Sequence, residues 1–416
     1  MEVDALLWRQ GLDFEQNITK RGALRQEFTP GRPVDKYRLF AGRRDQVDDV
    51  YDAVITEGMH VLLYGERGVG KTSLAQILHQ FLERAKVYSL NVKTINCDRT
   101  NDFTSLWQKV FREMNAEGHN AKDMIGAVLD KELITPDDVR FFLTRLDGHS
   151  LIIFDEFDKL PDPHSRVLFA DTIKNLADHA VKTTIMLVGV ADTIDELISE
   201  HKSIERSLSQ VRMPRMAPDE ITEIIERGFK NVEMEVSVPA KRLIALLSQG
   251  LPFYAHYLGL YSGLAALDQN RTLVEMLDVS DSTVKIVKKA HHVQTSYLAA
   301  VSSAQKNSIY PKVLLACAMV QTDEAGFFSA SDVSIPMSEI AGKRYEVQDY
   351  LKHIKNFCNH DRGKILVAVG PPNRVRYRFA DALMQPYVIL DGIAKGMLSV
   401  NNILSRKESK DELGSH

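Results

Sequence analysis

The sequence predicts an α/β protein with a doubly wound parallel sheet, followed by a helical region and a small unit of helices and a hairpin. Short apolar segments alternate with helical segments in the first half of the chain. Residues 151–154 and 184–190 are apolar on both faces, as parallel strands covered by helices are. After about Ala217 apolar residues recur with helical spacing up to about Ala300, so we expect the strands to stop there.

The elements of the first half can be placed individually. Residues 44–57 are expected to be helical, and residues 60–64 (HVLLY) to form a buried strand. A glycine-rich turn and a helix from Lys71 to about Arg84 should follow. Further strands are predicted at 92–96, 151–154 and 184–190. Strands and helices in this order are typical of a parallel sheet with helices on both faces.

The second half is predicted to be helical and to end in a hairpin. Pro218 should begin a helix, because proline in the first turn needs no partner for an N–H group. The last predicted elements are helices around 311–320 and 347–358 and strands at 365–369 and 375–379, with a turn at 370–373. Helices followed by a β-hairpin are typical of a winged helix.

These patterns divide the chain into five parts. They are an N-terminal extension (1–34), an α/β core (35–216), an α-helical lid and linker (217–300), a winged-helix domain (301–395) and a charged tail (396–416) that we expect to be disordered.

Composition excludes some classes of protein. With 416 residues, 44% hydrophobic and 26% charged, the chain has enough apolar material for two or three globular domains. The net charge of −4 gives no overall basic field for nucleic acid. Three dispersed cysteines do not form a disulfide framework. There is neither a membrane-length apolar run nor a basic N-terminal start, so we expect a cytoplasmic protein without membrane contact.

Residues 65–72 (GERGVGKT) carry the strongest chemical signal, since they match G-x-x-x-x-G-K-[ST] between a predicted strand and a predicted helix. The glycines allow backbone N–H groups to surround a phosphate, and the helix N-terminus favours an anion. Lys71 should reach the β- and γ-phosphates, and the Thr72 hydroxyl should bind Mg²⁺. The predicted nucleotide-binding residues here are Gly65, Arg67, Gly68, Val69, Gly70, Lys71, Thr72 and Ser73. The motif predicts binding of ATP with Mg²⁺.

Two acids follow the predicted strand 151–154. A carboxylate at the end of such a strand suits Mg²⁺ binding, which we assign to Asp155. A second carboxylate beside it can orient and deprotonate the attacking water, which we assign to Glu156. The alternative is an acidic helix start, but the phosphate-binding motif upstream favours a site for ATP hydrolysis.

Together with these motifs, three further segments make the chain resemble the AAA+/STAND superfamily of P-loop ATPases. They are residues 39–43 (LFAGR), 187–192 (LVGVAD) and 250–252 (GLP). The closest resemblance is to the branch that contains archaeal origin-recognition proteins and bacterial ATPases with a GxP lid. It covers about residues 35–270, and a C-terminal winged helix is a common companion in this branch. The resemblance implies that ATP binds between core and lid.

The resemblance also implies residues on the base side of the nucleotide. The segment 39–43 usually lies along the adenine, so Phe40, Ala41 and Arg43 are candidates; a plain loop before a helix is the alternative. In the STAND version of the lid, Pro252 packs near the adenine. His256 could sense phosphate, or it could be a packing residue of the lid.

Two further catalytic residues come from the resemblance. Asp192 falls at the polar sensor position after the fourth core strand, where it could instead cap a helix. Arg206 lies where the family often aims an arginine at the γ-phosphate of a neighbouring subunit. A solvated or ion-paired arginine is the alternative, and Arg212 and Arg215 are rivals for the same role.

The resemblance implies an ATP-hydrolysing molecular switch that works as a homo-oligomer and controls a partner or effector protein in trans, with bacterial defence as one setting. The alternative is a winged-helix DNA-binding ATPase of the initiator or transposition-regulator type. A chaperone-like remodeller is a more distant third.

The second strand of the hairpin leaves its role open. Its residues alternate, with Val375, Tyr377 and Phe379 on one face and Arg374, Arg376 and Arg378 on the other. The arginines could contact DNA phosphates or dock a protein. They could also be the charged face of an edge strand that blocks pairing with another sheet.

Overall fold

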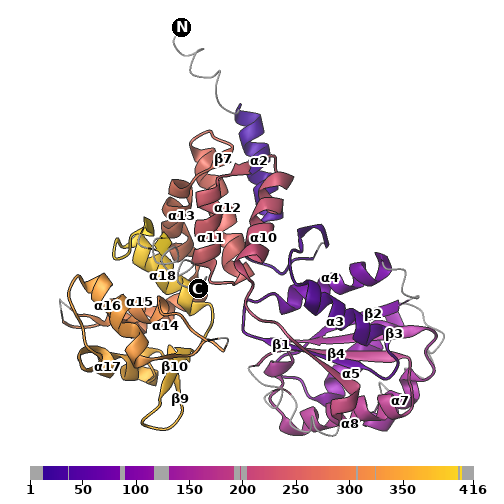
Figure 1. Cartoon of the computed structure of the whole chain (residues 1–416). Helices are drawn as coiled ribbons and strands as arrows, with labels where there is room; N and C mark the ends of the chain where they lie inside the picture. The colour runs from indigo at the N-terminus through magenta and orange to yellow at the C-terminus, as the bar shows by residue number, and fades with distance from the viewer. Residues whose placement is uncertain are drawn as a thin grey trace, which may run out of the picture. The chain divides into compact units, whose positions relative to one another are not determined.

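The computed structural model describes residues 13–35, 37–84, 90–116, 131–191, 204–305, 308–323, 325–401 and 403–404, together with Leu197. The chain divides into two compact units (Figure 1). One consists of Pro33–Pro214, and the other of Met1–Arg32 with Arg215–His416. No helix in these described ranges is long and apolar enough to cross a membrane.

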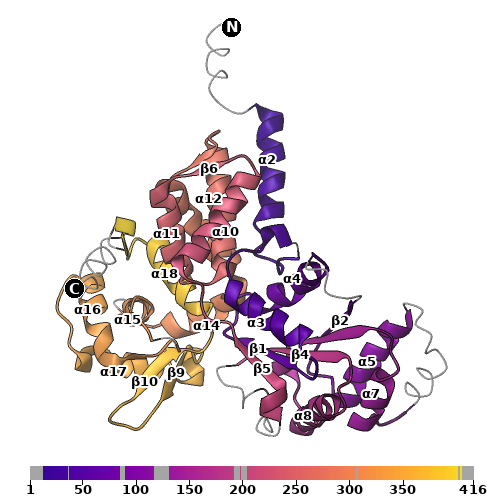
Figure 2. The same ribbon diagram turned by 45° about the vertical axis from the view of Figure 1, so that its right-hand side comes forward.

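The first unit is built on a five-stranded sheet in the order β2-β3-β4-β1-β5 (Figure 2), and its strands are parallel, as the sequence predicts. Its strands are β1 (His60–Gly65), β2 (Leu90–Asn96), β3 (His149–Asp155), β4 (Thr183–Val190) and β5 (Leu208–Arg212). The sequence did not reveal β5, because this edge strand is only partly buried and gives no continuous apolar run. The carboxyl ends of β1 and β3 carry predicted chemical residues.

Helices cover both faces of this sheet (Figures 1 and 2). They are α3 (Arg44–Ile55), α4 (Lys71–Arg84), α5 (Phe103–Ala116), α7 (Pro136–Leu143) and α8 (Pro163–Asp178). Helices α3 and α4 lie on one face, and α5, α7 and α8 lie on the other. The arrangement is the doubly wound architecture that the alternating pattern predicts.

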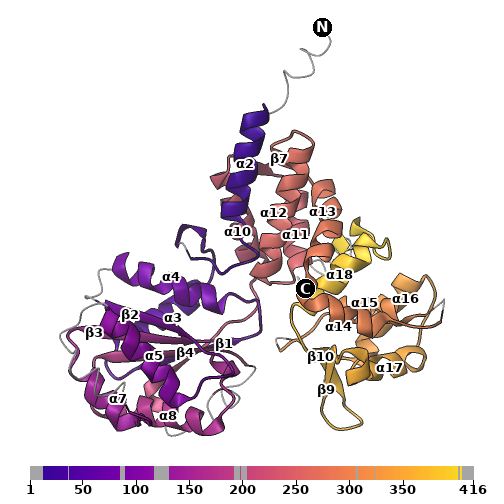
Figure 3. The same ribbon diagram turned by 180° about the vertical axis from the view of Figure 1, so that it is seen from behind.

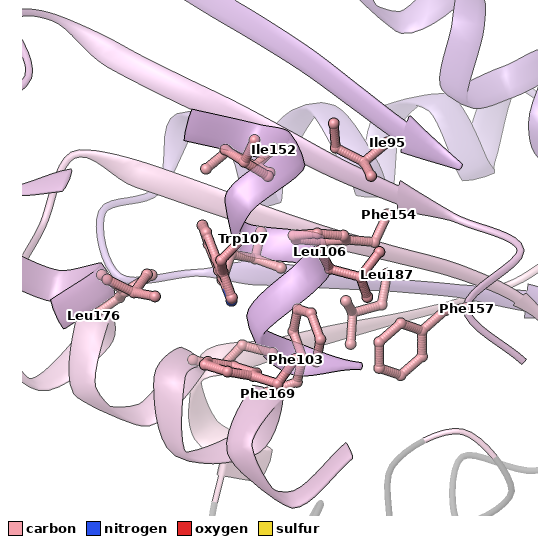
Figure 4. Close-up of a cluster of buried hydrophobic side chains, with 14 of the residues drawn as sticks. Ile95, Phe103, Leu106, Trp107, Ile152, Phe154, Phe157, Phe169, Leu176 and Leu187 are labelled. Carbon is pink, nitrogen blue, oxygen red and sulfur yellow. The ribbon is translucent and has the colours of Figure 1, made fainter. Parts of the chain in front are cut away.

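The face under α5 and α8 is an aromatic core (Figure 4). Trp107 lies 5.4 Å from Phe154 between ring centroids, and Phe154 lies 4.8 Å from Phe169. Phe157 also packs on Phe169, at 5.0 Å. Edge-to-face contacts of this kind add to the burial of the rings. Because Phe157 directly follows the acidic pair, its burial fixes the loop that carries Asp155 and Glu156.

The second unit contains a helical lid with α10 (Pro218–Asn231), α11 (Val238–Ser248), α12 (Pro252–Asp268), α13 (Met276–Lys289) and α14 (His291–Val301). Helix α10 begins at Pro218, as predicted. The prediction that strands stop after Ala217 is wrong for β6 (Glu235–Val236) and β7 (Leu273–Val274), which pair in parallel. Each has only two residues, too few to give an alternating pattern.

An N-terminal helix, α2 (Phe14–Glu27), packs on α10 and α12 of the lid (Figure 3). The ring of Phe28, directly after α2, lies against Gly228 and Gly259. A Cβ atom at either glycine would lie 2.4 Å from the ring, so these positions have no room for a larger residue. The Lys20 ammonium donates to the carbonyl of Val232 at 2.9 Å. The described part of the N-terminal extension up to Arg32 therefore belongs to the same compact unit as the lid.

The C-terminal elements are α15 (Tyr310–Ala318), β8 (Phe328–Ser329), α16 (Ser334–Ala341), α17 (Val347–Asn356), β9 (Leu366–Val369), β10 (Arg376–Phe379) and α18 (Met384–Ala394). The strands form an antiparallel sheet in the order β8-β10-β9. The interpretation of the arginine strand as an edge strand is therefore wrong, since β10 is central. Strand β8 has two residues and gave no signal in the sequence.

The prediction of a disordered tail from 396 onward is wrong for its first residues. Leu398 and Ile403 are buried, because residues 396–404 are mostly uncharged and include several apolar side chains. Residues 405–416, where the charges gather, lie outside the described residues.

Candidate functional site

The loop between β1 and α4 has a backbone shape that depends on glycine. Gly65, Gly68 and Gly70 have φ values of 149°, 84° and 100°. A Cβ atom on Gly65 would lie 2.4 Å from the carbonyl oxygen of Met213. Side chains rarely adopt such conformations, so the motif residues are required by the turn itself. Successive N–H groups in a turn of this kind, placed before a helix N-terminus, form a concave site for a phosphate.

Lys71 begins α4 and is buried in this loop. Its ammonium donates to the carbonyl oxygens of Gly65, at 2.9 Å, and Glu66, at 2.8 Å. Burial lowers the pKa of Lys71 to about 8, and the nearby carboxylates of Asp158 and Asp155 oppose that decrease. An ammonium has three N–H donors, so the charge is held by the loop with capacity for a further acceptor.

Thr72 of α4 and Asp155 of β3 meet, although β4 lies between β3 and β1, the strand that precedes α4. The Thr72 hydroxyl donates to the Asp155 carboxylate, and Asp155 Oδ1 accepts the N–H of Glu156 at 2.8 Å. Burial raises the pKa of Asp155. A hydroxyl and a carboxylate are hard oxygen ligands, which suit Mg²⁺. Within the described ranges no group of three His, Cys, Asp or Glu side chains could hold a metal ion by itself, so phosphate and water oxygens would complete the shell of such an ion.

Glu156 follows β3 in a left-handed conformation, with φ of 56°. Its carboxylate accepts from the ammonium of Lys159 at 2.5 Å, and both side chains are about half exposed. A non-glycine residue in this region of φ is strained, and such strain often occurs at functional sites. The geometry presents a carboxylate that water can reach, next to the buried Asp155.

Of the predicted base-side residues, Arg43 contacts the phosphate loop. Arg43 is buried with φ of 63°, and its Nη2 donates to the carbonyl of Val69 at 3.0 Å. Ala41 is buried, and Phe40 packs partly buried against a small cluster that includes Ile77 of α4. Arg43 therefore supports the loop backbone, whereas Phe40 packs on α4.

The other predicted loop residues differ in their surroundings. Val69 is buried, whereas Arg67 is exposed. The Ser73 hydroxyl accepts the N–H of Val34 at 3.0 Å, so it holds the segment that leads to Phe40.

The lid residues belong to the second unit. Pro252 is the first residue of α12, after Gln249 and Gly250 with φ of 51° and 73°. His256 is buried, and its Nδ1 accepts the N–H of Thr29 at 3.2 Å. Burial lowers the pKa of His256 to about 4. A neutral ring that accepts a backbone N–H fits the interpretation of His256 as a packing residue.

Of the two predicted catalytic residues from the end of the core, the structure describes one, Arg206. Asp192 lies outside the described residues. Arg206 is exposed in a short 3₁₀ turn (Glu205–Ser207) and makes no hydrogen bond or ion pair with any residue that the structure describes. Its rival Arg215 donates to Gln385 Oε1 at 2.7 Å. Arg212 ends β5, where it stands opposite Tyr64.

Sequence reasoning missed Asp158. Its Oδ1 accepts the N–H of Val190, the last residue of β4, at 2.8 Å. The only signal in the sequence is a third acid in the run 155–158 (DEFD), which we did not separate from the acidic pair. The site therefore contains a carboxylate that connects the loop after β3 to the end of β4.

A phosphate-binding loop on β1, with a lysine, a threonine and an acidic strand end converging on it, defines a P-loop ATPase. Comparison with known proteins adds the family: residues 55–198 match the model of a family described as an AAA domain. A comparison with curated proteins found no match. The chain is a P-loop ATPase with an AAA domain at residues 55–198.

Solved structures show which fold this ATPase has. The chain is similar to the ORC2 protein of Aeropyrum pernix, solved as ADPNP–ADP complexes, with 15% identity, a TM-score of 0.51 and coverage of 92% of this chain and 98% of that one. It is also similar to a Walker-type ATPase of Pyrococcus abyssi, with 16% identity, a TM-score of 0.50 and coverage of 87% and 99%. The chain therefore shares the fold of these two proteins.

Proposed function

We propose that this ATPase is a molecular switch that passes its nucleotide state from the phosphate loop to the C-terminal helices. In the proposed site Lys71 binds the β- and γ-phosphates, and Thr72 and Asp155 hold Mg²⁺. The metal ion would neutralise charge on the phosphates. Glu156 accepts a proton from the attacking water, and the exposure of about half of its side chain supports this role.

This proposal rests on the hydrogen bonds of the segment Met213–Met216, within which the chain crosses from one unit to the other. In the first unit the Met213 N–H donates to the Tyr64 carbonyl at 2.7 Å, next to Gly65 of the phosphate loop. In the second unit the Met216 N–H donates to the Gly250 carbonyl at 2.8 Å. A movement of the phosphate loop therefore acts on a segment that is also bonded to the lid.

Arg215 extends this connection within the second unit. Its guanidinium donates to Gln385 Oε1 of α18 at 2.7 Å and to the Gln249 carbonyl at 3.5 Å. Gln385 is buried, and its amide donates to the carbonyl of Ala318, the last residue of α15, at 3.1 Å. One side chain thus connects the crossing segment with the lid and with two C-terminal helices.

The test is amide hydrogen exchange in α15 and α18, measured with ADP and with a non-hydrolysable ATP analogue. We expect the two nucleotides to give different protection in the parent. Arg215→Ala should keep nucleotide binding and lose this difference, and Gln385→Ala should reproduce that loss from the other partner. Arg344→Ala is the control, since this arginine is exposed and, among the described residues, forms an ion pair with Glu346 alone. An unchanged difference in Arg215→Ala would refute the proposed route.

We propose further that the switch works as a homo-oligomer. This rests on Arg206, which is exposed and has no partner among the described residues. A guanidinium offered to the γ-phosphate of a neighbouring subunit stabilises the charge of phosphoryl transfer. Inactive Arg206→Ala protein mixed with inactive Lys71→Ala protein should then recover activity, because mixed interfaces pair an intact loop with an intact arginine. No recovery at any ratio, with a rate per protomer that is independent of concentration, would indicate a self-contained monomer.

DNA binding is the second candidate function, favoured by the order of the C-terminal elements. Three helices (α15, α16 and α17) with a sheet in the order β8-β10-β9 have the connectivity of a winged helix. Lys352 and Lys355 are exposed on α17, and Arg374 is exposed in the turn before β10. These residues, rather than Arg376 and Arg378, would contact the phosphates. The STAND assignment and a setting in bacterial defence remain predictions from the resemblance.

A further inference from the structure

The turn after β3 is held at both of its ends. It is a 3₁₀ turn, Phe157–Lys159, that follows the acidic pair. Phe157 holds the first end of this turn, because its ring is buried in the aromatic core. Arg166 of α8 holds its other end, because its Nη2 donates to the carbonyl of Leu160 at 2.8 Å. The middle residue, Asp158, is therefore presented at a fixed place.

Asp158 reaches the end of the neighbouring strand. Its Oδ1 accepts the N–H of Val190 at 2.8 Å. A Cβ atom on Gly189 would lie 3.3 Å from both the Oδ1 and the backbone N of Asp158, so the turn and the strand approach closely. Val190 stands opposite Gly65 in the register of β4 with β1. One carboxylate thus connects the loop of Asp155 and Glu156 to the residue that faces the first glycine of the phosphate loop.

We propose that Asp158 is a positioning residue for ATP hydrolysis, which holds the loop of Asp155 and Glu156 in place against the end of β4. This rests on the proposed role of Glu156 as the base. Strand β4 separates β3 from β1, so the distance between the carboxylates and the phosphate loop depends on how the ends of these strands are held together. A displacement of about 1 Å in such a site can cost roughly 100-fold in rate.

The test compares Asp158→Ala, which removes the acceptor, with Asp158→Asn, which keeps an oxygen of similar shape. Positioning predicts that Asp158→Ala lowers kcat by roughly 10- to 100-fold. The KM for ATP and the affinity for a labelled ATP analogue should stay within about threefold of the parent, since the phosphate loop is intact. Asp158→Asn should restore most of kcat, because its side-chain oxygen can still accept the N–H of Val190.

Asp162→Ala is the matched control. Asp162 lies four residues further on and caps α8 by accepting the N–H groups of His164 and Ser165. Its replacement should lower the thermal stability and leave kcat unchanged. A kcat of Asp158→Ala equal to that of the parent or of Asp162→Ala would overturn the proposal, and so would an Asp158→Asn protein as slow as Asp158→Ala.

Glu156→Gln measured in parallel distinguishes failure of the base assignment from failure of the positioning role of Asp158. If Glu156→Gln hydrolyses ATP at the parental rate, the base assignment fails, whatever Asp158 does. If Glu156→Gln is inactive while Asp158→Ala is as fast as the parent, only the positioning role is refuted.

Discussion

The phosphate loop of the first unit and the hairpin of the second both present cations, but they use them differently. In the loop, the Lys71 ammonium is held by two backbone carbonyls in a turn made for a phosphate. In the hairpin, Arg376 forms an ion pair with Asp323 at 2.7 Å and lies 5.5 Å over the ring of Phe327. Arg378 lies 4.9 Å over the same ring.

The difference shows what a row of cations in a sequence can and cannot tell. Alternation correctly placed Tyr377 and Phe379 on the buried face of β10, with the arginines on the other face. It did not show that two of these arginines already have partners on a loop some fifty residues earlier. A spacing pattern gives the face of a strand, whereas a ligand role also requires that the charge be aimed at a site.

The largest effect is expected at Lys71, the cation of the phosphate loop. Lys71→Met keeps the volume of the buried side chain and removes its charge, so the fold should survive. We expect the affinity for ATP to fall by roughly 100-fold or more, since a buried charge loses its partner. Equilibrium binding of a labelled ATP analogue measures this, and thermal unfolding checks the fold. A loss of less than about tenfold would mean that the loop backbone alone carries the binding.

Glu156→Gln should affect hydrolysis without affecting binding. The amide keeps the shape of the side chain but cannot accept a proton from water. Single-turnover hydrolysis should therefore fall by roughly 100- to 10,000-fold. Asp147→Asn, at another exposed acid of the same unit, is the control and should hydrolyse ATP like the parent. Parental hydrolysis by Glu156→Gln would transfer the role of base to another group.

Sequence alone predicted four of the five strands of the sheet, the helix after the phosphate loop and the convergence of Lys71, Thr72 and Asp155. The helix and the convergence follow from a motif whose first glycine has no alternative, because Gly65 must approach the Met213 carbonyl. The contact of Asp158 with Val190 could not be predicted, since the two residues lie 32 apart in the chain. Such a contact depends on the register of β4 and on the 3₁₀ turn that follows the left-handed Glu156.

Each unit also contains a buried histidine that accepts a backbone N–H. His60 Nδ1 accepts from Ile185 at 2.9 Å in the first unit, and His256 Nδ1 accepts from Thr29 at 3.2 Å in the second. Burial lowers the pKa of His60 to about 3 and that of His256 to about 4. The folded pKa lies below the unfolded value, so each histidine contributes stability above about pH 6.5 that is lost as the pH falls.

We therefore expect both units to lose stability between pH 7 and pH 5, by about 2 kcal/mol for His256. Urea unfolding at the two pH values measures the change, and His256→Gln and His60→Gln isolate each histidine. A variant without the ionisable ring should lose less stability on acidification than the parent. Equal pH dependence in His256→Gln and the parent would mean that the ring is protonated in the folded state.

The smallest effects concern the three arginines of the hairpin. Two of them contact neighbouring side chains, and the third is exposed in the turn. Arg376 and Arg378 contact Phe327, and Arg376 also pairs with Asp323. Replacing either by Gln should lower the free energy of unfolding by about 0.5–1 kcal/mol, as expected for partly exposed ion pairs and cation–π contacts. ATP hydrolysis should not change. Arg374 is exposed in the turn, so Arg374→Gln should leave stability unaltered.

The DNA-binding hypothesis predicts the opposite order of effects for these arginine replacements. If the C-terminal unit binds a duplex through its exposed cations, Arg374→Gln should weaken binding to any sequence and reduce the salt dependence by about one phosphate contact. Arg376→Gln should have a smaller effect, because its guanidinium is already paired with Asp323. Titration of the parent and both variants with duplexes of different sequence at several salt concentrations separates the cases. A larger loss of DNA affinity in Arg376→Gln than in Arg374→Gln would mean that the ion pair opens to bind phosphate. The cations of the hairpin would then act on a ligand as Lys71 does in the phosphate loop, and the contrast between the two regions would not hold.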